Sequence, residues 1–93
     1  MPTLKVAHVN EQGVDLIIVP LDPSFGSKSK GEQDHAIVEI QSAARSAGLA
    51  GTVVPVWESS GRMRFIAPTR WHPFFQSLSF DRVAANVNRT LTW

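Results

Sequence analysis

The feature that most constrains the fold is a short apolar run from Val14 to Leu21, with the sequence VDLIIVPL. Its side chains are almost all aliphatic, and a run of this length is typical of a strand buried inside a sheet. The preceding LKVAHV alternates apolar and polar side chains, as a half-buried strand does. The turn-forming NEQG lies between the two. Together these segments predict a β-hairpin, and Pro20, which cannot donate a hydrogen bond, predicts the end of its second strand.

A helix is predicted over residues 29–47. Ser29 and, three positions later, Glu32 match a capping box, in which each side chain bonds the other residue's backbone N–H. Apolar side chains then recur at helical spacing, at Ile37, Ile40, Ala44 and Ala47. Gly48 suits a left-handed residue that ends the helix.

A second hairpin is predicted from the segments TVVPVW and RMRF, which flank the turn-like ESSG. The two arginines of RMRF, Arg62 and Arg64, alternate with apolar side chains. They should therefore share one face of the strand, while Met63 and Phe65 share the other. Pro55 predicts that the first strand of this hairpin lies at a sheet edge or carries a bulge.

Two further helices are predicted after Pro68. Pro73 suits the first turn of a short helix over residues 74–78, where its missing N–H costs nothing. Ser79 is a suitable N-terminal cap for a last helix, predicted over residues 79–91. The apolar stripe of that helix consists of Phe80, Val83, Ala84, Val87 and Leu91.

These elements predict a single α+β domain over residues 1–93, in the order ββαββα. The economical assembly places the two β-hairpins in one mainly antiparallel sheet, with the helices packed on one face. The opposite face of the sheet would then be open for contacts.

The formal net charge of +1 is unevenly spread along the chain. Residues 1–58 carry a net charge of −3 and residues 59–93 a net charge of +4. The basic residues of the second part are all arginines, at positions 62, 64, 70, 82 and 89. Arginine forms bidentate contacts with carboxylate and phosphate and stacks on aromatic rings. The charge pattern alone leaves two alternatives, a solvated surface with local acid–base pairing or an anion-binding surface.

Several classes of function are disfavoured by the composition. The chain has no cysteine, which excludes disulfides, thiolate metal sites and a cysteine nucleophile. The histidines His8, His35 and His72 show no metal-ligand spacing, so no metal and no cofactor are expected. No apolar run is long enough for a transmembrane helix, and the first residues lack the apolar segment of a signal peptide, so a cytoplasmic protein without membrane contact is expected.

The segment TRWHPFFQSL, residues 69–78, gathers aromatic and basic side chains around Pro73. Extended backbone before this proline favours a partly exposed Trp71 with its ring available to Arg64 or Arg70 for a cation–π contact. The alternative is a Trp71 that is simply part of the core. Phe74 is expected in the core and Phe75 only partly covered. The candidate binding surface therefore comprises Arg62, Arg64, Arg70, Trp71, His72 and Phe75.

The sequence favours a small non-catalytic binding or regulatory module that acts through protein–protein contact, with homodimerisation included. Aromatic residues, methionine and arginine are the types enriched where interfaces bind most strongly. A first alternative is a single-stranded nucleic-acid-binding domain that uses the arginines and aromatic rings together. A second is a small enzyme with His72 as a general acid or base, although no nucleophile motif is present.

Overall fold

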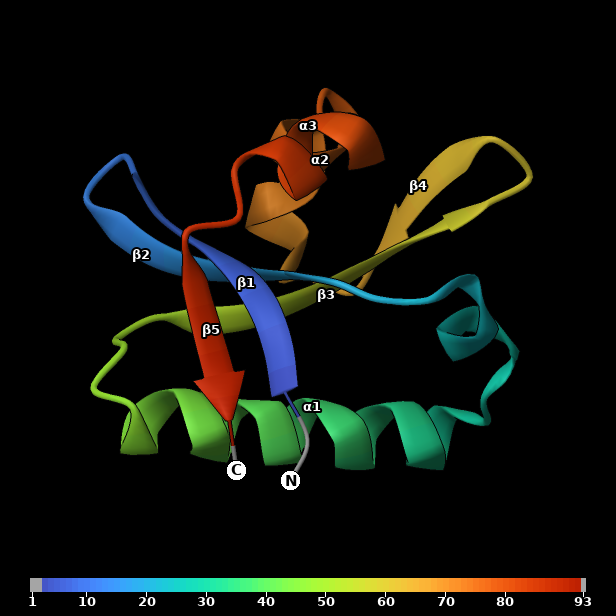
Figure 1. Ribbon diagram of the computed structural model, residues 1–93. Coiled ribbons are helices and arrows are strands. Elements are labelled where there is room, and N and C mark those ends of the chain that lie inside the picture. The colour runs from blue at the N-terminus through green and yellow to red at the C-terminus, as the bar shows by residue number, and fades with distance from the viewer. Residues whose placement is uncertain (1–2, 93) are drawn as a thin grey trace.

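The computed structural model describes residues 3–92, which form one five-stranded mixed sheet with helices (Figure 1). The strands are β1 Thr3–Glu11, β2 Val14–Pro20, β3 Thr52–Ser59, β4 Arg62–Phe65 and β5 Arg89–Thr92. The α-helices are α1 Lys30–Ser46, α2 His72–Gln76 and α3 Phe80–Ala85, and two short 3₁₀ helices span Pro23–Ser27 and Thr69–Trp71. Across the sheet the strands follow the order β4-β3-β2-β1-β5.

The two predicted hairpins are present, but they are joined differently from the prediction. β1 pairs with β2 and β3 with β4, each pair antiparallel. β2 and β3 run parallel, because α1 carries the chain back to the starting end of the sheet before β3 begins. The α+β class is correct, and three of the four strand pairings within residues 3–92 are antiparallel. The predicted order ββαββα is wrong, because β2 and β3 pair in parallel and a fifth strand follows the last helix.

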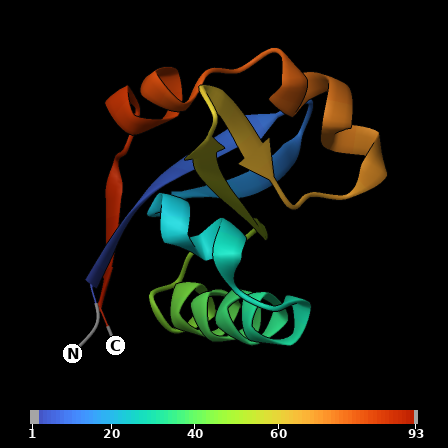
Figure 2. The same ribbon diagram turned by 90° about the vertical axis from the view of Figure 1, so that its right-hand side faces the viewer.

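Helices cover both faces of the sheet, so the predicted open face does not exist. Figure 2 shows α1 below the sheet and α2 and α3 above it. The physical reason lies in the central strands, where residues 16–19 of β2 and 53–57 of β3 are buried without a break. Strands that are apolar on both faces need a cover on both.

Two hydrophobic clusters result, one on each face. The cluster under α1 includes Val6, Ile17, Val19, Ile40, Ala44, Val53 and Leu91. The cluster under α2 and α3 includes Ala7, Leu16, Ile18, Val54, Val56, Trp71, Phe75 and Val83. Alternate residues of the same strands therefore contribute to opposite clusters, as the pleat of a strand requires.

The helix α1 begins and ends close to the predicted positions. The backbone N–H of Glu32 donates to the hydroxyl of Ser29, and the N–H of Ser29 donates to the carboxylate of Glu32, which completes the capping box. Gly48 has a φ of +80°, and the N–H of Leu49 donates to the carbonyl of Ala44 at 2.9 Å. No helix within residues 3–92 is long and apolar enough to span a membrane.

The predicted last helix is wrong beyond Ala85. Ser79 does cap it, since its hydroxyl accepts from the N–H of Arg82 at 3.2 Å. The helix stops at Asn86, whose side-chain amide donates to the carbonyl of Arg82 at 2.7 Å, and the chain then joins the sheet as β5. Leu91 is buried as expected, but it lies on a strand.

Of the two predictions made from prolines in the strands, the one for Pro20 is correct and the one for Pro55 is wrong. Pro20 is the last residue of β2, as expected. Pro55 predicts an edge strand or a bulge, yet β3 lies between β2 and β4 and pairs with both in an unbroken register. Pro55 faces the end of β4, where Ile66 donates to its carbonyl at 3.1 Å. The N–H that Pro55 lacks would have faced Ile66, just beyond the last residue of β4. Its absence therefore removes no hydrogen bond between β3 and β4.

Candidate functional site

A groove with a volume of about 760 Å³ lies between β4 and the helices α2 and α3. Its apolar residues are Met63, Phe65, Phe75, Leu78 and Phe80. Its polar and charged residues are Glu58, Arg62, Arg64, His72, Gln76, Ser79 and Asp81, with Gly61 at the turn. The groove thus combines an apolar floor with charged residues of both signs.

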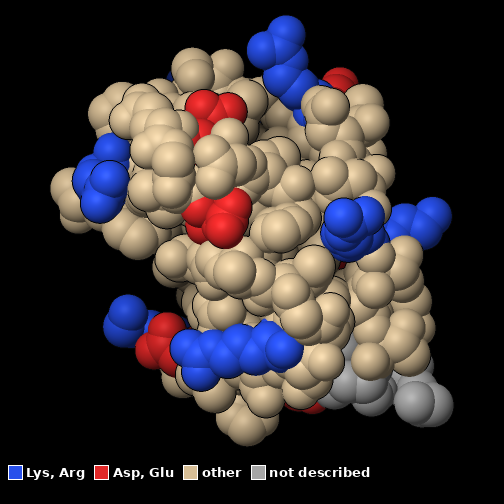
Figure 3. All heavy atoms as spheres, turned by 90° about the vertical axis from the view of Figure 1, so that its left-hand side faces the viewer, with Lys and Arg blue, Asp and Glu red and all other residues tan. Residues whose placement is uncertain are grey.

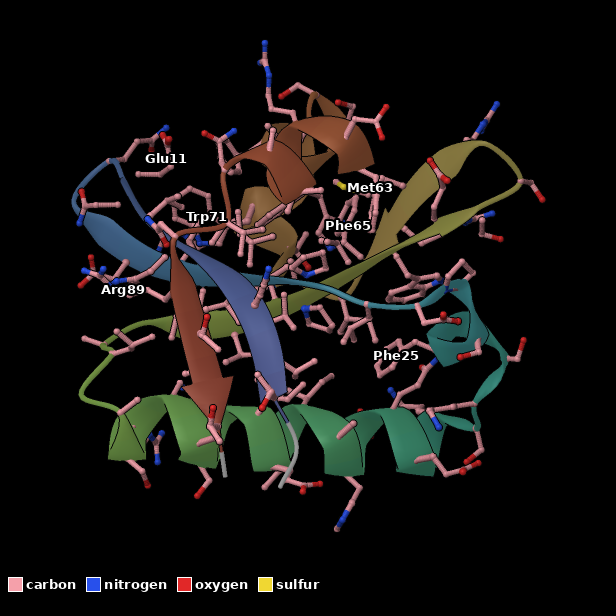
Figure 4. The ribbon with its side chains drawn as sticks, in the orientation of Figure 1. Glu11, Phe25, Met63, Phe65, Trp71 and Arg89 are labelled. Atoms are coloured by element: carbon pink, nitrogen blue, oxygen red, sulfur yellow. The ribbon has the colours of Figure 1, made fainter. Side chains whose placement is uncertain are left out.

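Two residues of the apolar floor, Met63 and Phe65, come from β4, where they alternate with arginines in the segment RMRF. Met63 and Phe65 are half-buried and pack against the cluster under α2 and α3. Figure 4 shows both side chains directed from β4 toward these helices. The ring of Phe65 lies 5.4 Å from that of Phe75 and 5.3 Å from that of His72, measured between centroids. β4 and α2 are therefore held together by ring contacts among residues that line the groove.

Arg62 and Arg64 are exposed on the opposite face of β4. In the register of β3 with β4, Arg64 lies opposite Trp57 and Arg62 opposite Ser59, and directly opposed residues of an antiparallel pair share a face. Trp57 is buried there against the ring of Phe25, at 5.1 Å between centroids. The two arginines thus border the groove from the other face of the strand, where their neighbours on β3, Trp57 and Ser59, are uncharged.

β4 is an edge strand of the sheet, and its backbone orientation follows from two hydrogen bonds. Ile66 donates to Pro55, which makes this a hydrogen-bonded pair, and such pairs alternate with non-hydrogen-bonded ones along an antiparallel ladder. The carbonyl of Val56 accordingly turns to the other side, where it accepts from Leu21 at 2.8 Å. The N–H and C=O groups of Met63 and Phe65 therefore point away from β3, toward the free edge.

Two of the predicted surface residues are buried. Trp71 is 5 % exposed and Phe75 is 1 % exposed, so the expected partial exposure of both is wrong. The error comes from His72, which was expected to be extended before Pro73 but has helical φ and ψ of −56° and −46°. The helical turn directs Trp71 inward. The cation–π contact of Arg70 is present, with its guanidinium carbon 5.3 Å from the centre of the Trp71 ring.

His72 holds the start of α2 against the segment that follows β4. Its Nε2 lies 3.0 Å from the carbonyl oxygen of Ala67, and because a carbonyl only accepts, Nε2 carries the proton. The ring also meets Phe65 edge-on. Within residues 3–92, no three His, Asp or Glu side chains gather closely enough to hold a metal ion.

The structure brings part of the predicted surface together. Arg62, Arg64, His72 and Phe75 line the groove, whereas Arg70 and Trp71 lie outside its lining. Leu78, Phe80 and Asp81 also line the groove, and the sequence analysis did not predict this. It placed Phe80 in the apolar stripe of the last helix and gave Leu78 and Asp81 no place in a site. The alternation of RMRF was the one local signal that pointed to Met63 and Phe65 as a separate apolar surface.

No protein-family model matches this chain, and no curated protein and no solved structure matches it either. The groove and the strand beside it are therefore the basis of the functional proposal.

Proposed function

We propose that the protein is a small binding module that acts through protein–protein contact at the groove between β4 and α2–α3. One observation carries this proposal: the free edge of β4 lies beside a groove with an apolar floor. Proteins usually shield such edges, because unpaired backbone groups invite another chain to pair with them. A partner that fills the groove would cover the half-buried side chains and the edge together.

Single-stranded nucleic-acid binding receives less support from the arrangement. Bases need exposed aromatic faces beside the basic residues, and every Phe and Trp within residues 3–92 is buried or half-buried. Arg62 and Arg64 also lie across the strand from Phe65. Figure 3 shows the side of the molecule away from β4, where Lys and Arg side chains are spread over the face and its outline and form no single patch.

Site-specific photo-crosslinking in the native cells tests the proposal. A photoreactive amino acid replaces Gln76, which is exposed in the groove. The control replaces Arg45, which is exposed on α1, across the sheet. We expect a discrete protein adduct from position 76 that is absent from position 45.

The crosslinked protein is then identified, purified and titrated against the unmodified chain. Binding that is weakened by Met63→Asp but not by Arg45→Asp supports the proposal. Adducts that are the same at both positions, or binding that is unaffected by Met63→Asp, contradict it. Amide NMR spectra of both variants verify that the fold is retained.

A further inference from the structure

We infer that the partner supplies an extended strand with alternating apolar and acidic side chains, which pairs with the edge of β4. This inference rests on the proposed function and specifies the chemistry of the partner. It follows from three properties of β4: the direction of its free backbone groups, the alternation of its side chains, and the uncharged residues, Ser59 and Trp57, that lie directly opposite its arginines.

The backbone of β4 offers a template for one more strand. The N–H and C=O groups of Met63 and Phe65 point to the free edge, as the Ile66–Pro55 hydrogen bond and the pairing register require. An added strand would satisfy these groups with main-chain hydrogen bonds. Such bonds give affinity whatever the sequence of the partner, while its alternate side chains give specificity.

The side chains of β4 set what the added strand should carry on each face. Cross-strand neighbours share a face of the sheet, so every second residue of the partner would lie beside Met63 and Phe65, over the groove. Apolar side chains fit there, because the rest of the apolar floor consists of Phe75, Leu78 and Phe80.

The remaining residues of the partner would lie beside Arg62 and Arg64. These arginines face Ser59 and Trp57 on β3, so neither has a carboxylate as its cross-strand neighbour there. Acidic residues on the added strand would supply that neighbour. Arginine and carboxylate match in charge and in planar geometry.

A second copy of this chain is a poor occupant of the edge. A symmetric β4–β4 pair would be antiparallel, and the edge-facing residues Met63 and Phe65 of one copy would lie opposite those of the other. Arginine would then lie opposite arginine. Like charges directly opposed across strands are destabilising, so the pattern favours a different chain.

Blocked heptapeptides provide the test, by NMR titration of the intact protein. The first peptide alternates valine and glutamate, and the second replaces each glutamate by lysine. The third has the same composition as the first, but its valines form one block and its glutamates another. We expect the valine–glutamate peptide to bind roughly 4- to 30-fold more tightly than the lysine peptide, because two attractive cross-strand pairs become repulsive. The block peptide should bind more weakly than the alternating one.

Backbone N-methylation tests strand pairing separately from side-chain contact. In an antiparallel complex the valine N–H groups face β4, and in a parallel complex the glutamate N–H groups do. Methylating the residues whose N–H groups face β4 should therefore abolish binding, while methylating the other residues should be tolerated. Equal effects of the two methylations overturn the inference.

Charge reversal in the protein completes the test. Arg64→Glu should reduce the preference for glutamate over lysine by about fivefold or more, whereas Arg45→Glu on α1 should leave it unchanged. Equal affinity of the glutamate and lysine peptides for the unmodified protein, or no binding at millimolar concentration, overturns the strand inference. The crosslinking experiment judges the proposed function independently, since it requires no particular partner sequence.

Discussion

The side-chain amide of Asn88 pairs with both main-chain groups of His8. Its oxygen accepts from the N–H of His8 at 2.9 Å, and its nitrogen donates to the carbonyl of His8 at 3.0 Å. The backbone N–H of Asn88 donates in addition to Val6 at 3.0 Å. The amide thus takes the place of a strand partner at the point where the chain leaves α3 and joins β1 as β5.

Replacing Asn88 should weaken the attachment of β5. Asn88→Ala removes both bonds and should lower the free energy of unfolding by about 0.5–1.5 kcal/mol, a modest value because the site is exposed to water. Asn88→Asp should cost more than Asn88→Ala, since a carboxylate oxygen would then face the carbonyl of His8. Urea denaturation measures both, with the exposed Gln76→Ala as a control. Equal stability of all three variants would contradict this role.

The position of β5 shows where local sequence patterns stop being informative. Val83, Val87 and Leu91 repeat at helical spacing, and only the first of them lies in a helix. What decides the structure is a long-range contact, the amide of Asn88 on His8, which no local pattern shows. The central strands and α1 were predictable, because apolar runs and capping residues act over a few positions.

Trp71 should be a major contributor to stability. It is 5 % exposed and belongs to the cluster under α2 and α3, so Trp71→Ala should lower the free energy of unfolding by about 3–5 kcal/mol. Arg70→Ala removes only the cation–π contact and should cost about 0.5–1 kcal/mol. Thermal or urea unfolding compares the two. A loss below about 1 kcal/mol for Trp71→Ala would mean that this side chain is exposed in solution.

The candidate site was predictable only where side-chain direction follows from strand alternation. Arg62 and Arg64 are exposed as expected. The directions of Trp71 and Phe75 depend on whether His72 is extended or helical, and a following proline favours the first. Tertiary packing overrides that preference here. The Nε2 of His72 donates to the carbonyl of Ala67, and the rings of Trp71 and Phe75 lie in the core.

Gly26 should not tolerate a side chain. A Cβ added there would lie 2.5 Å from Nε1 of Trp57, and that indole is buried against Phe25. Gly26→Ala should therefore lower the free energy of unfolding by about 1–3 kcal/mol. Gly31→Ala is the matched control, because nothing lies within 4 Å of the added atom and alanine favours the helix. Urea denaturation of both variants checks the pair, and equal losses would contradict the close packing.

The start of α1 should loosen in acid. The backbone N–H and then the hydroxyl of Ser29 hold the pKa of Glu32 below its ordinary value of 4.5. A lowered pKa in the folded state means that this carboxylate stabilises the fold above about pH 4.5 and that its contribution is lost as the pH falls through the lowered value. Amide exchange in the first turn of α1 should accelerate there.

Glu32→Gln provides the control for this pH dependence. Glutamine can complete the same capping box but does not titrate in this range. The variant should therefore lose the acid-dependent loosening of the first turn. A profile that is identical in the variant and in the original chain would assign the effect to another group.

Hydrogen exchange at the amides of β4 tests most directly whether this strand is an open edge that takes up another. In the free protein, the amides of Met63 and Phe65 should exchange faster than those of Arg64 and Ile66, which face β3. With the valine–glutamate heptapeptide at about ten times its Kd, exchange at Met63 and Phe65 should slow by about tenfold. Protection of these two amides in the free protein, or unchanged exchange in the complex, would contradict the account.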